Sequence, residues 1–166
     1  THYLLKHAYS NVQTDDFKIA FMETAGINLD WFFDEWIYRS GFPEYKVSYE
    51  RKNNQVIFYV NQTEKVDNLM SYFKMPVVFE VHFKDGSFSS RKEWLSHAAD
   101  TVYVHAPGGK KIDYTLFDPG SNLIKIVDFH KSFDELAAQA ENATHMIDRS
   151  DALGTLGDSG LEKNKD

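Results

Sequence analysis

The sequence predicts an α+β protein in which an antiparallel, seven-stranded β-sandwich is flanked by N-terminal helices and a C-terminal helix. Hydrophobic residues recur with the helical period before residue 42, alternate with period two between 43 and 130, and return to the helical period from Ser132. Short alternating runs separated by turn residues, with no helices between them, are typical of antiparallel sandwiches. We therefore expect three parts, at 1–42, 43–130 and 131–166.

Two helices are predicted in the N-terminal part. Thr14 is the expected N-cap of the first, because its hydroxyl can accept a bond from an unpaired amide of the first turn. Gly26 is expected to end that helix in the left-handed conformation. The second helix is expected over 28–39, where apolar residues at i, i+3, i+4, i+7 and i+8 form a wide stripe, and Gly41 and Pro43 follow as stop signals.

The expected strands alternate apolar and polar residues and are separated by turn formers. Lys52-Asn53-Asn54 marks the turn of one hairpin, and Lys84-Asp85-Gly86 marks a second, in which Asp-Gly supplies the positive φ of a tight turn. The expected strands cover residues 45–50, 56–60, 77–83, 87–94, 101–105, 112–117 and 123–127.

A helix is predicted after the last strand. Ser132 and Glu135 have the spacing of a capping box, and apolar residues continue at helical spacing to Ile147. A further helix start is expected at 148–153. Three glycines and a polar end follow at 154–166, so we expect that tail to be frayed.

Composition excludes several classes of function. The chain has 18 Lys and Arg against 25 Asp and Glu, a net charge of -7, and no cationic run, so we expect no nucleic-acid partner. It has no cysteine, which excludes disulfides, thiolate metal sites and a cysteine nucleophile. No apolar run approaches the ~20 residues that span a bilayer, so we expect no membrane span. The compartment stays open.

No residue pattern predicts an active site. None of the seven histidines begins a His-Glu-x-x-His sequence, which would place two zinc ligands and a general base on one helix. His82 and His105 lie in predicted strands and are expected to point to solvent. Gly157-Asp158-Ser159-Gly160 resembles the nucleophile loop of trypsin-like proteases but lacks its surroundings, so we attribute it to chance.

The acidic groups fit helix ends and exposed helix faces better than a metal site. These groups are Asp15/Asp16, Asp30/Asp34/Glu35 and Glu135/Glu141. We therefore expect no catalytic, substrate-binding or metal-ligating residue in this chain.

One motif has a more specific meaning. Leu29-Asp30-Trp31-Phe32-Phe33-Asp34-Glu35-Trp36, followed by Gly41-Phe42-Pro43, resembles the end of the catalytic domain in zinc aminopeptidases of the aminopeptidase N family. There a Leu-x-x-Phe-Phe-x-x-Trp helix precedes Gly-x-Pro and then a β-sandwich. His7-Ala8-Tyr9 upstream, and Phe117-Asp118-Pro119 and the helical residues 139–153 downstream, resemble the neighbouring family elements, so the likeness spans nearly the whole chain.

The resemblance implies an enzyme that removes N-terminal residues from peptides, using zinc held by two histidines and a glutamate. In the family those ligands lie upstream of the segment that this chain resembles. The chain is therefore expected to be a non-catalytic C-terminal portion of a zinc aminopeptidase, with the sandwich linking the catalytic and helical domains. We expect zinc and peptide substrate in the parent and no cofactor in this segment.

Two alternatives stay open. The parent can be a scaffold from a family member that has lost the zinc motif, or the chain can be a stand-alone β-sandwich module that binds protein or carbohydrate through exposed aromatic rings. The candidate rings are Tyr103, Tyr114 and Trp94. The linker hypothesis instead predicts exposed apolar surface near Tyr3, Phe17 and Phe21 and a tendency to self-associate.

Overall fold

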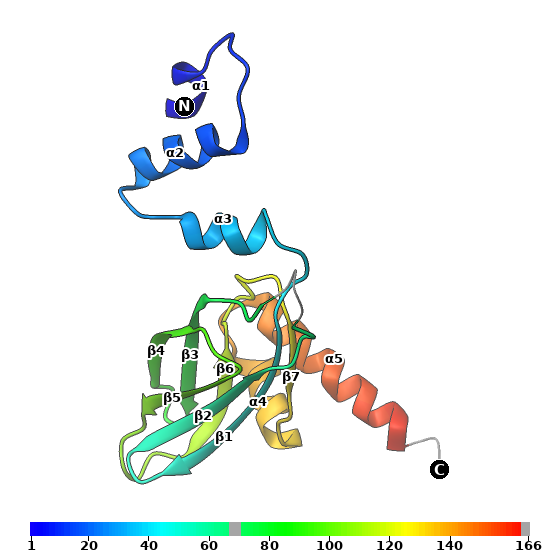
Figure 1. The fold of residues 1–166 in the computed structure, drawn as a ribbon. Helices are drawn as coiled ribbons and strands as arrows, with labels where there is room; N and C mark the ends of the chain where they lie inside the picture. Colours follow the sequence, from blue (N-terminus) through cyan, green and yellow to red (C-terminus); the bar gives the residue numbers. More distant parts are fainter. Residues whose placement is uncertain (67–70, 164–166) are drawn as a thin grey trace. The chain divides into compact units, whose positions relative to one another are not determined.

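The computed structural model describes residues 1–66 and 71–163 of the chain, and side chains as far as Asp158. Among these residues it has five helices and seven strands (Figure 1). The chain divides into two compact units, which we call the N-terminal unit (Thr1–Gly41 with Val66–Ser71) and the sandwich unit (Phe42–Lys65 with Tyr72–Asp166).

The N-terminal unit contains three helices, α1 (His2–Lys6), α2 (Thr14–Ala25) and α3 (Asp30–Trp36). The expected cap of α2 was wrong by one residue, because Gln13 rather than Thr14 has the extended backbone of an N-cap. The Gln13 N–H donates to the Asp16 carboxylate at 2.8 Å, and the Gln13 side chain accepts from the Asp16 N–H in return. Gly26 ends α2 with a φ of 68°, as predicted.

The second predicted helix is shorter than expected. α3 begins where the Asn28 side chain accepts the Asp30 N–H at 2.7 Å. It ends where the Phe33 carbonyl accepts from both Ile37 and Tyr38, each at 3.0 Å. Because the bond from Tyr38 reaches back five residues, the helical ladder stops there, and the end predicted at residue 39 lies beyond the helix.

The sandwich unit contains two sheets. Their strands are β1 (Glu44–Lys52), β2 (Gln55–Gln62), β3 (Met75–Phe83), β4 (Phe88–Leu95), β5 (Ala99–His105), β6 (Ile112–Phe117) and β7 (Ile126–Phe129). One sheet has the order β5-β2-β1-β7 and the other β4-β3-β6 (Figure 1). The hairpin turns are those predicted, since Asn53 has a φ of 54° and Gly86 a φ of 81°.

The sandwich is not wholly antiparallel, which corrects the prediction. Glu44–Val47 of β1 pairs with Ile126–Phe129 of β7 in parallel. A parallel pair needs a long crossover, and here the rest of the sandwich supplies it. β7 also begins later than the predicted run 123–127, because Asp118 holds the preceding loop by accepting bonds from the Leu123 N–H at 3.0 Å and the Lys125 ammonium at 2.6 Å.

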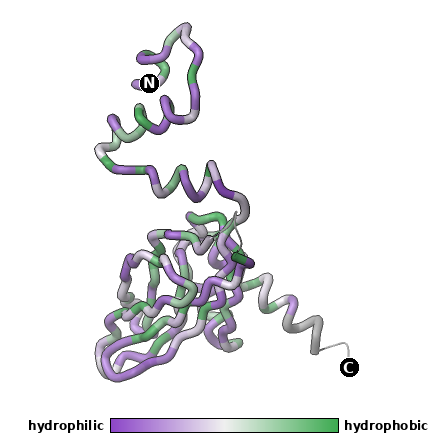
Figure 2. The backbone as a smooth tube through the Cα atoms, in the orientation of Figure 1, coloured by the Kyte–Doolittle hydropathy of each residue, from purple (hydrophilic) through white to green (hydrophobic). Residues whose placement is uncertain are grey.

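Aromatic rings connect the two sheets through the core. Phe58 of β2 lies 5.1 Å from Phe79 of β3 between ring centres, and Phe79 lies 5.3 Å from Phe117 of β6. Along β3 every second side chain from Met75 is buried, which is the alternation that predicted a strand with one core face. Figure 2 shows this alternation of hydrophobic and hydrophilic residues along the sandwich.

Two helices follow the last strand, and the second extends beyond the helix start predicted at 148–153. α4 (Phe133–Asn142) begins as predicted, with the Ser132 hydroxyl accepting the Glu135 N–H at 3.3 Å. It stops at Ala143, whose backbone is extended with a ψ of 140° and whose side chain is buried in the sandwich unit. The predicted continuation to Ile147 was therefore wrong.

α5 (Met146–Lys163) continues through the glycine-rich stretch that we expected to be frayed. Its first turns are anchored by Asp148 and Ala152, which are both buried, and adding turns to an existing helix is far easier than starting one. Residues 164–166 of the predicted tail lie outside the described residues.

Candidate functional site

Hydrogen bonds between polar side chains and backbone groups join the C-terminal helices to the sandwich. We call this set the polar joint, and its members are Thr115, Gly120, Lys131, Gln139 and Asp148. They come from β6, the loop after β6, the segment before α4, and both C-terminal helices. All of them lie within the sandwich unit.

Lys131 is the central donor of the polar joint. Its ammonium donates to the Thr115 carbonyl at 2.7 Å and to Gln139 Oε1 at 2.6 Å, and it lies 4.6 Å from the centre of the Phe129 ring. Burial lowers the pKa of Lys131 to about 8, although the nearby carboxylates, Glu135 first, act in the opposite direction. The ammonium therefore ties β6 to α4 at a cost in lost hydration.

Asp148 is the central acceptor. Its two carboxylate oxygens each lie 3.0 Å from the Gly120 nitrogen, and its backbone carbonyl accepts from Gln139 Nε2 at 2.7 Å. Burial raises the pKa of Asp148, while the bond from the Gly120 N–H lowers it. Gly120 has a φ of 78°, and a Cβ there would lie 3.3 Å from the His145 ring, so glycine suits this close approach.

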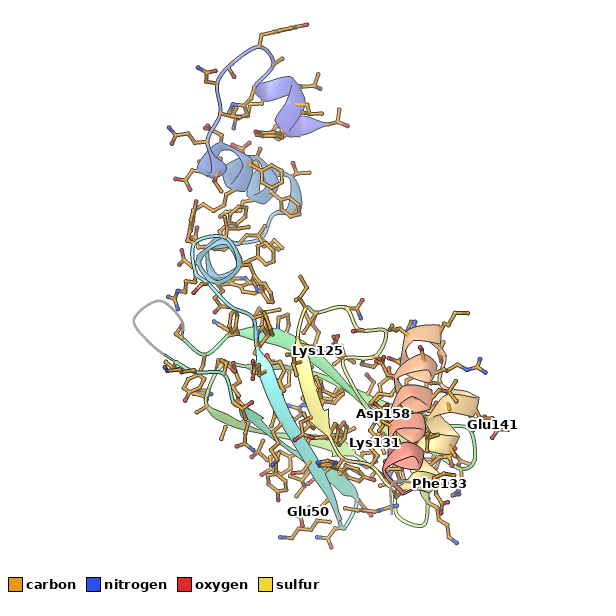
Figure 3. All side chains as sticks on the ribbon, turned by 90° about the vertical axis from the view of Figure 1, so that its right-hand side faces the viewer. Glu50, Lys125, Lys131, Phe133, Glu141 and Asp158 are labelled. Atoms are coloured by element: carbon orange, nitrogen blue, oxygen red, sulfur yellow. The ribbon has the colours of Figure 1, made fainter. Side chains whose placement is uncertain are left out.

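An ion pair fixes the loop beside the polar joint. The Lys125 ammonium lies 2.6 Å from Asp118, and the two side chains are only 7% and 4% exposed. Breaking such a pair leaves an uncompensated buried charge, which is strongly destabilising. Figure 3 labels Lys125, Lys131 and Asp158, and these three residues line a hollow of about 480 Å³ between the loop, β7 and α5.

The geometry of the polar joint suits positioning rather than bond making. Each charged group already has a partner inside the joint or beside it. Across the described part of the chain, no three His, Cys, Asp or Glu side chains are grouped to hold a metal ion, so these residues do not fit zinc. We derive no metal chemistry from this chain's own side chains.

The N-terminal unit exposes large apolar side chains. Phe17 contacts Tyr3 and Phe33, with ring centres 5.2 and 6.3 Å apart, yet it stays 45% exposed. Phe21 is exposed to a similar degree, and the leucines of α1 are more exposed still. The predicted exposed apolar surface in this region is confirmed, whereas self-association stays a prediction.

Two sequence expectations about strand side chains need correction. His82 does not point freely to solvent, because its ring is stacked between Phe88 and Tyr114 and its Nε2 lies 2.8 Å from Glu80. Tyr114 is only 3% exposed and cannot be a platform for a ligand ring. The cause is α4 and the turn after it, which cover part of this outer sheet face.

The other predicted candidates stay on the surface. Trp94, Tyr103 and His105 are exposed. Gly157-Asp158-Ser159-Gly160 lies in helix α5 rather than in a loop, and the side chain of Ser159 lies outside the described residues. This stretch therefore lacks the loop conformation of a protease nucleophile.

The acidic groups have structural partners. Lys18 lies 3.1 Å from Asp30 and 3.5 Å from Asp15, and hydrogen bonding from Lys18 lowers the pKa of Asp30. Asp16 accepts the Gln13 N–H at the start of α2, and the Glu135 carboxylate accepts from the Thr115 hydroxyl at 3.3 Å. These contacts account for Asp15, Asp16 and Asp30 as helix-end and inter-helix charges and give Glu135 a partner in the sandwich.

Sequence reasoning missed the polar joint. A weak signal exists for Asp148, because it lies four residues before Ala152 and thus on the same helix face as a buried alanine. Lys131 stands directly before the N-cap Ser132, but nothing in the sequence says that its ammonium is enclosed. Which polar residues become buried depends on the packing of distant elements.

Comparison with known proteins identifies the fold. No protein-family model matches the chain, and no curated protein matches it either. Among solved structures, it is similar to the aminopeptidase A of Legionella pneumophila in complex with aspartic acid, with a TM-score of 0.72 and 14% identity. The match covers 90% of this chain and 17% of that chain. The fold is therefore aminopeptidase-like, and the chain corresponds to a small part of that enzyme's length.

No helix in the described part of the chain has both the length and the apolar character needed to cross a membrane.

Proposed function

We propose that this chain is a non-catalytic portion of a zinc aminopeptidase of the aminopeptidase N family, in which the sandwich links a catalytic domain to a helical domain. The observation that carries the proposal is the likeness to an aminopeptidase over 90% of this chain but 17% of that enzyme. The Leu29–Trp36 motif and the following Gly41-Phe42-Pro43 support the choice of family. Peptide hydrolysis and zinc then belong to the parent protein.

Two features of the molecule support a linking role. Exposed aromatic side chains such as Phe17 and Phe21 suit helices that pack against further parts of a catalytic domain. The polar joint suits a rigid connection, because Lys131 and Asp148 each bind backbone groups of elements far apart in the chain.

A zinc assay tests the non-catalytic assignment. The purified chain is incubated with zinc and an aminoacyl fluorogenic substrate. The control contains zinc and the substrate but no protein. We expect no turnover above the control, because no described side chains form a zinc site. Turnover that a chelator abolishes would contradict the proposal.

The reading frame upstream of Thr1 tests the family. We expect a His-Glu-x-x-His sequence there, with a glutamate ligand further along. In the protein encoded by that whole reading frame, Phe17→Asp should lower aminopeptidase activity, while Tyr103→Asp on the four-stranded sheet should leave the activity unchanged. A reading frame that encodes the same domains without the zinc motif would instead favour the alternative of a scaffold protein that has lost the zinc site.

A second candidate function is a carbohydrate-binding surface on the four-stranded sheet. Tyr59 and Tyr103 are both exposed there, and the register places them on the same face, one step apart diagonally. Flat, exposed rings of this kind can stack on sugars. Sedimentation of the chain with insoluble starch and cellulose tests this, with Tyr103→Ala expected to release it; no sedimentation of the unaltered chain would reject the candidate.

A further inference from the structure

A second hollow, of about 560 Å³, lies on the outer face of the three-stranded sheet, and the proposed linking role does not use it. Its volume falls within the range of small-molecule sites. We call it the outer hollow, and the side chains that define its chemistry are Glu80, His82, Lys84, Phe88, Asp113 and Tyr114. All of them belong to the sandwich unit.

Three stacked rings form one wall of the outer hollow. The strand register places His82 of β3 opposite both Phe88 of β4 and Tyr114 of β6. The His82 ring lies 4.3 Å from Tyr114 at an interplanar angle of 10°, and 5.2 Å from Phe88 at 15°. Tyr114 is buried at one end of the stack and Phe88 is exposed at the other. Both faces of the His82 ring are covered, so the stack gives the hollow a fixed apolar wall in which Phe88 is the exposed ring.

The polar lining of the outer hollow is mainly acidic. Glu80 and Asp113 keep only 20% and 16% of their side chains exposed, whereas Lys84, which pairs with Asp113 at 3.2 Å, is 62% exposed. The partner of Glu80 is His82, at 2.8 Å. The outer hollow therefore holds two largely buried carboxylates and one ammonium that is mostly in solvent.

The phenol at the base of the wall keeps its proton. Burial raises the pKa of Tyr114 to about 12, and the charges of Asp113 and Glu80 add to this shift. Tyr114 therefore adds a neutral ring rather than an anion to the hollow. The remaining rim comes from the turn between α4 and α5, which contributes the neutral polar side chains of Asn142 and Thr144 and the imidazole of His145.

We propose that the outer hollow binds a small organic amine, with its ammonium between Glu80 and Asp113 and its apolar body against the ring of Phe88. The ammonium replaces Lys84 beside Asp113, which costs little because Lys84 is largely hydrated already. An anion would meet two carboxylates. A bare metal ion lacks a set of three ligands in the described residues and makes no use of the aromatic wall.

Benzylamine is the probe, and benzoate is its matched control with the same ring and the opposite charge. Titrations are followed by two-dimensional NMR, which detects weak binding and locates it. We expect saturable shifts around the outer hollow with benzylamine, with a Kd on the order of 1 mM for a ligand of this size. We expect no saturable shifts with benzoate.

Variants then locate the charge and the wall. Glu80→Gln and Asp113→Asn should each weaken benzylamine binding about tenfold, because each removes a charged acceptor. Glu93→Gln is the matched control, since Glu93 lies on β4 opposite Val77 and thus on the other face of the sheet. Phe88→Ala removes an exposed ring and should weaken binding several-fold without endangering the fold.

Three results would overturn the amine site. The first is the absence of saturable benzylamine shifts at the outer hollow, and the second is benzoate binding as tightly as benzylamine. The third is unchanged benzylamine affinity in the Phe88→Ala variant and also in a correctly folded Glu80→Gln or Asp113→Asn variant. Aminopeptidase assays do not enter this test, so its outcome is separate from that of the linking role.

Discussion

The helices at the two ends of the chain differ in what their apolar faces touch. In the sandwich unit, Leu136 of α4 and Ala152 of α5 are buried and polar side chains hold both helices, although other apolar side chains of these helices, Phe133 and Leu153 among them, are exposed. In the N-terminal unit, Ala20 of α2 is buried, but Phe17 and Phe21 of the same helix stay about half exposed. α2 and α4 both begin with capping contacts and have helical periodicity, so these local signals do not account for the difference.

The contrast shows that packing against other elements, and not capping or periodicity, determines how much of the apolar surface of each helix is buried. Helices of 5, 12 and 7 residues, such as α1, α2 and α3, are marginal in water without packing. α4 and α5 receive that packing from the sandwich. The N-terminal unit keeps apolar surface in excess of its own core, which is the property that the proposed linking role uses.

The largest expected effect contrasts a core ring with a surface ring. Phe58→Ala should lower the free energy of unfolding of the sandwich by about 3 to 5 kcal/mol, because Phe58 is fully buried and a cavity remains. Phe17→Ala should change the stability of the N-terminal unit by less than about 1 kcal/mol. Urea unfolding followed by NMR signals of each unit measures both. Equal losses of unfolding free energy in the two variants would contradict the proposed difference between the units.

The next effect is a pH dependence of the polar joint. The folded-state pKa of Lys131 is about 8, below the ordinary 10.5, so between these values the unfolded chain binds a proton that the folded chain does not. Stability should therefore rise with pH through this window, by roughly 2 kcal/mol between pH 7 and pH 10. The Lys131→Met variant should lack this rise.

Urea unfolding at closely spaced pH values up to 10 measures the effect of Lys131. Above pH 10 the raised pKa values of Tyr49 and Tyr114 act in the opposite direction, because the folded state then holds protons that the unfolded state releases. A rise of the same size in the Lys131→Met variant would show that another group titrates.

A smaller effect tests the acceptor side of the joint. Asp148→Ala should lower stability by about 1 to 3 kcal/mol, because the Gly120 N–H loses its acceptor inside the structure. Asp148→Asn retains an acceptor oxygen and should recover most of the loss. Asp151→Ala, at an exposed position three residues further along α5, is the control. Thermal unfolding compares the variants, and an Asn variant as unstable as the Ala variant would contradict this role.

The smallest effect uses two glycines in open space. Gly154 lies inside α5 with nothing within 4 Å of an added Cβ, so Gly154→Ala should stabilise that helix by about 0.5 to 1 kcal/mol. Gly26 also has open space but a φ of 68°, so Gly26→Ala should destabilise the end of α2 by about 1 kcal/mol. Thermal unfolding by circular dichroism detects the opposite signs; the same sign for both would show that backbone conformation is not what distinguishes them.

The α+β class, the order of the elements and the turns between them follow from the sequence alone. Gly86 and Gly26 adopt positive φ as predicted, the turn at Asn53 forms where it was predicted, and Ser132 caps α4, because these features depend on a few adjacent residues. The alternation along β3 likewise depends only on which face meets a core. Local chemistry was sufficient for all of these.

Which distant segments meet depends on the packing of the whole folded chain. The parallel pairing of β7 with β1, the burial of Tyr114 and the enclosure of Lys131 all depend on partners far away in the chain. The periodicity of apolar residues indicates that one face of an element is buried, but not which segment of the chain buries it. For that reason both the polar joint and the outer hollow, which are built from strands and helix ends brought together by folding, could not be predicted from the sequence.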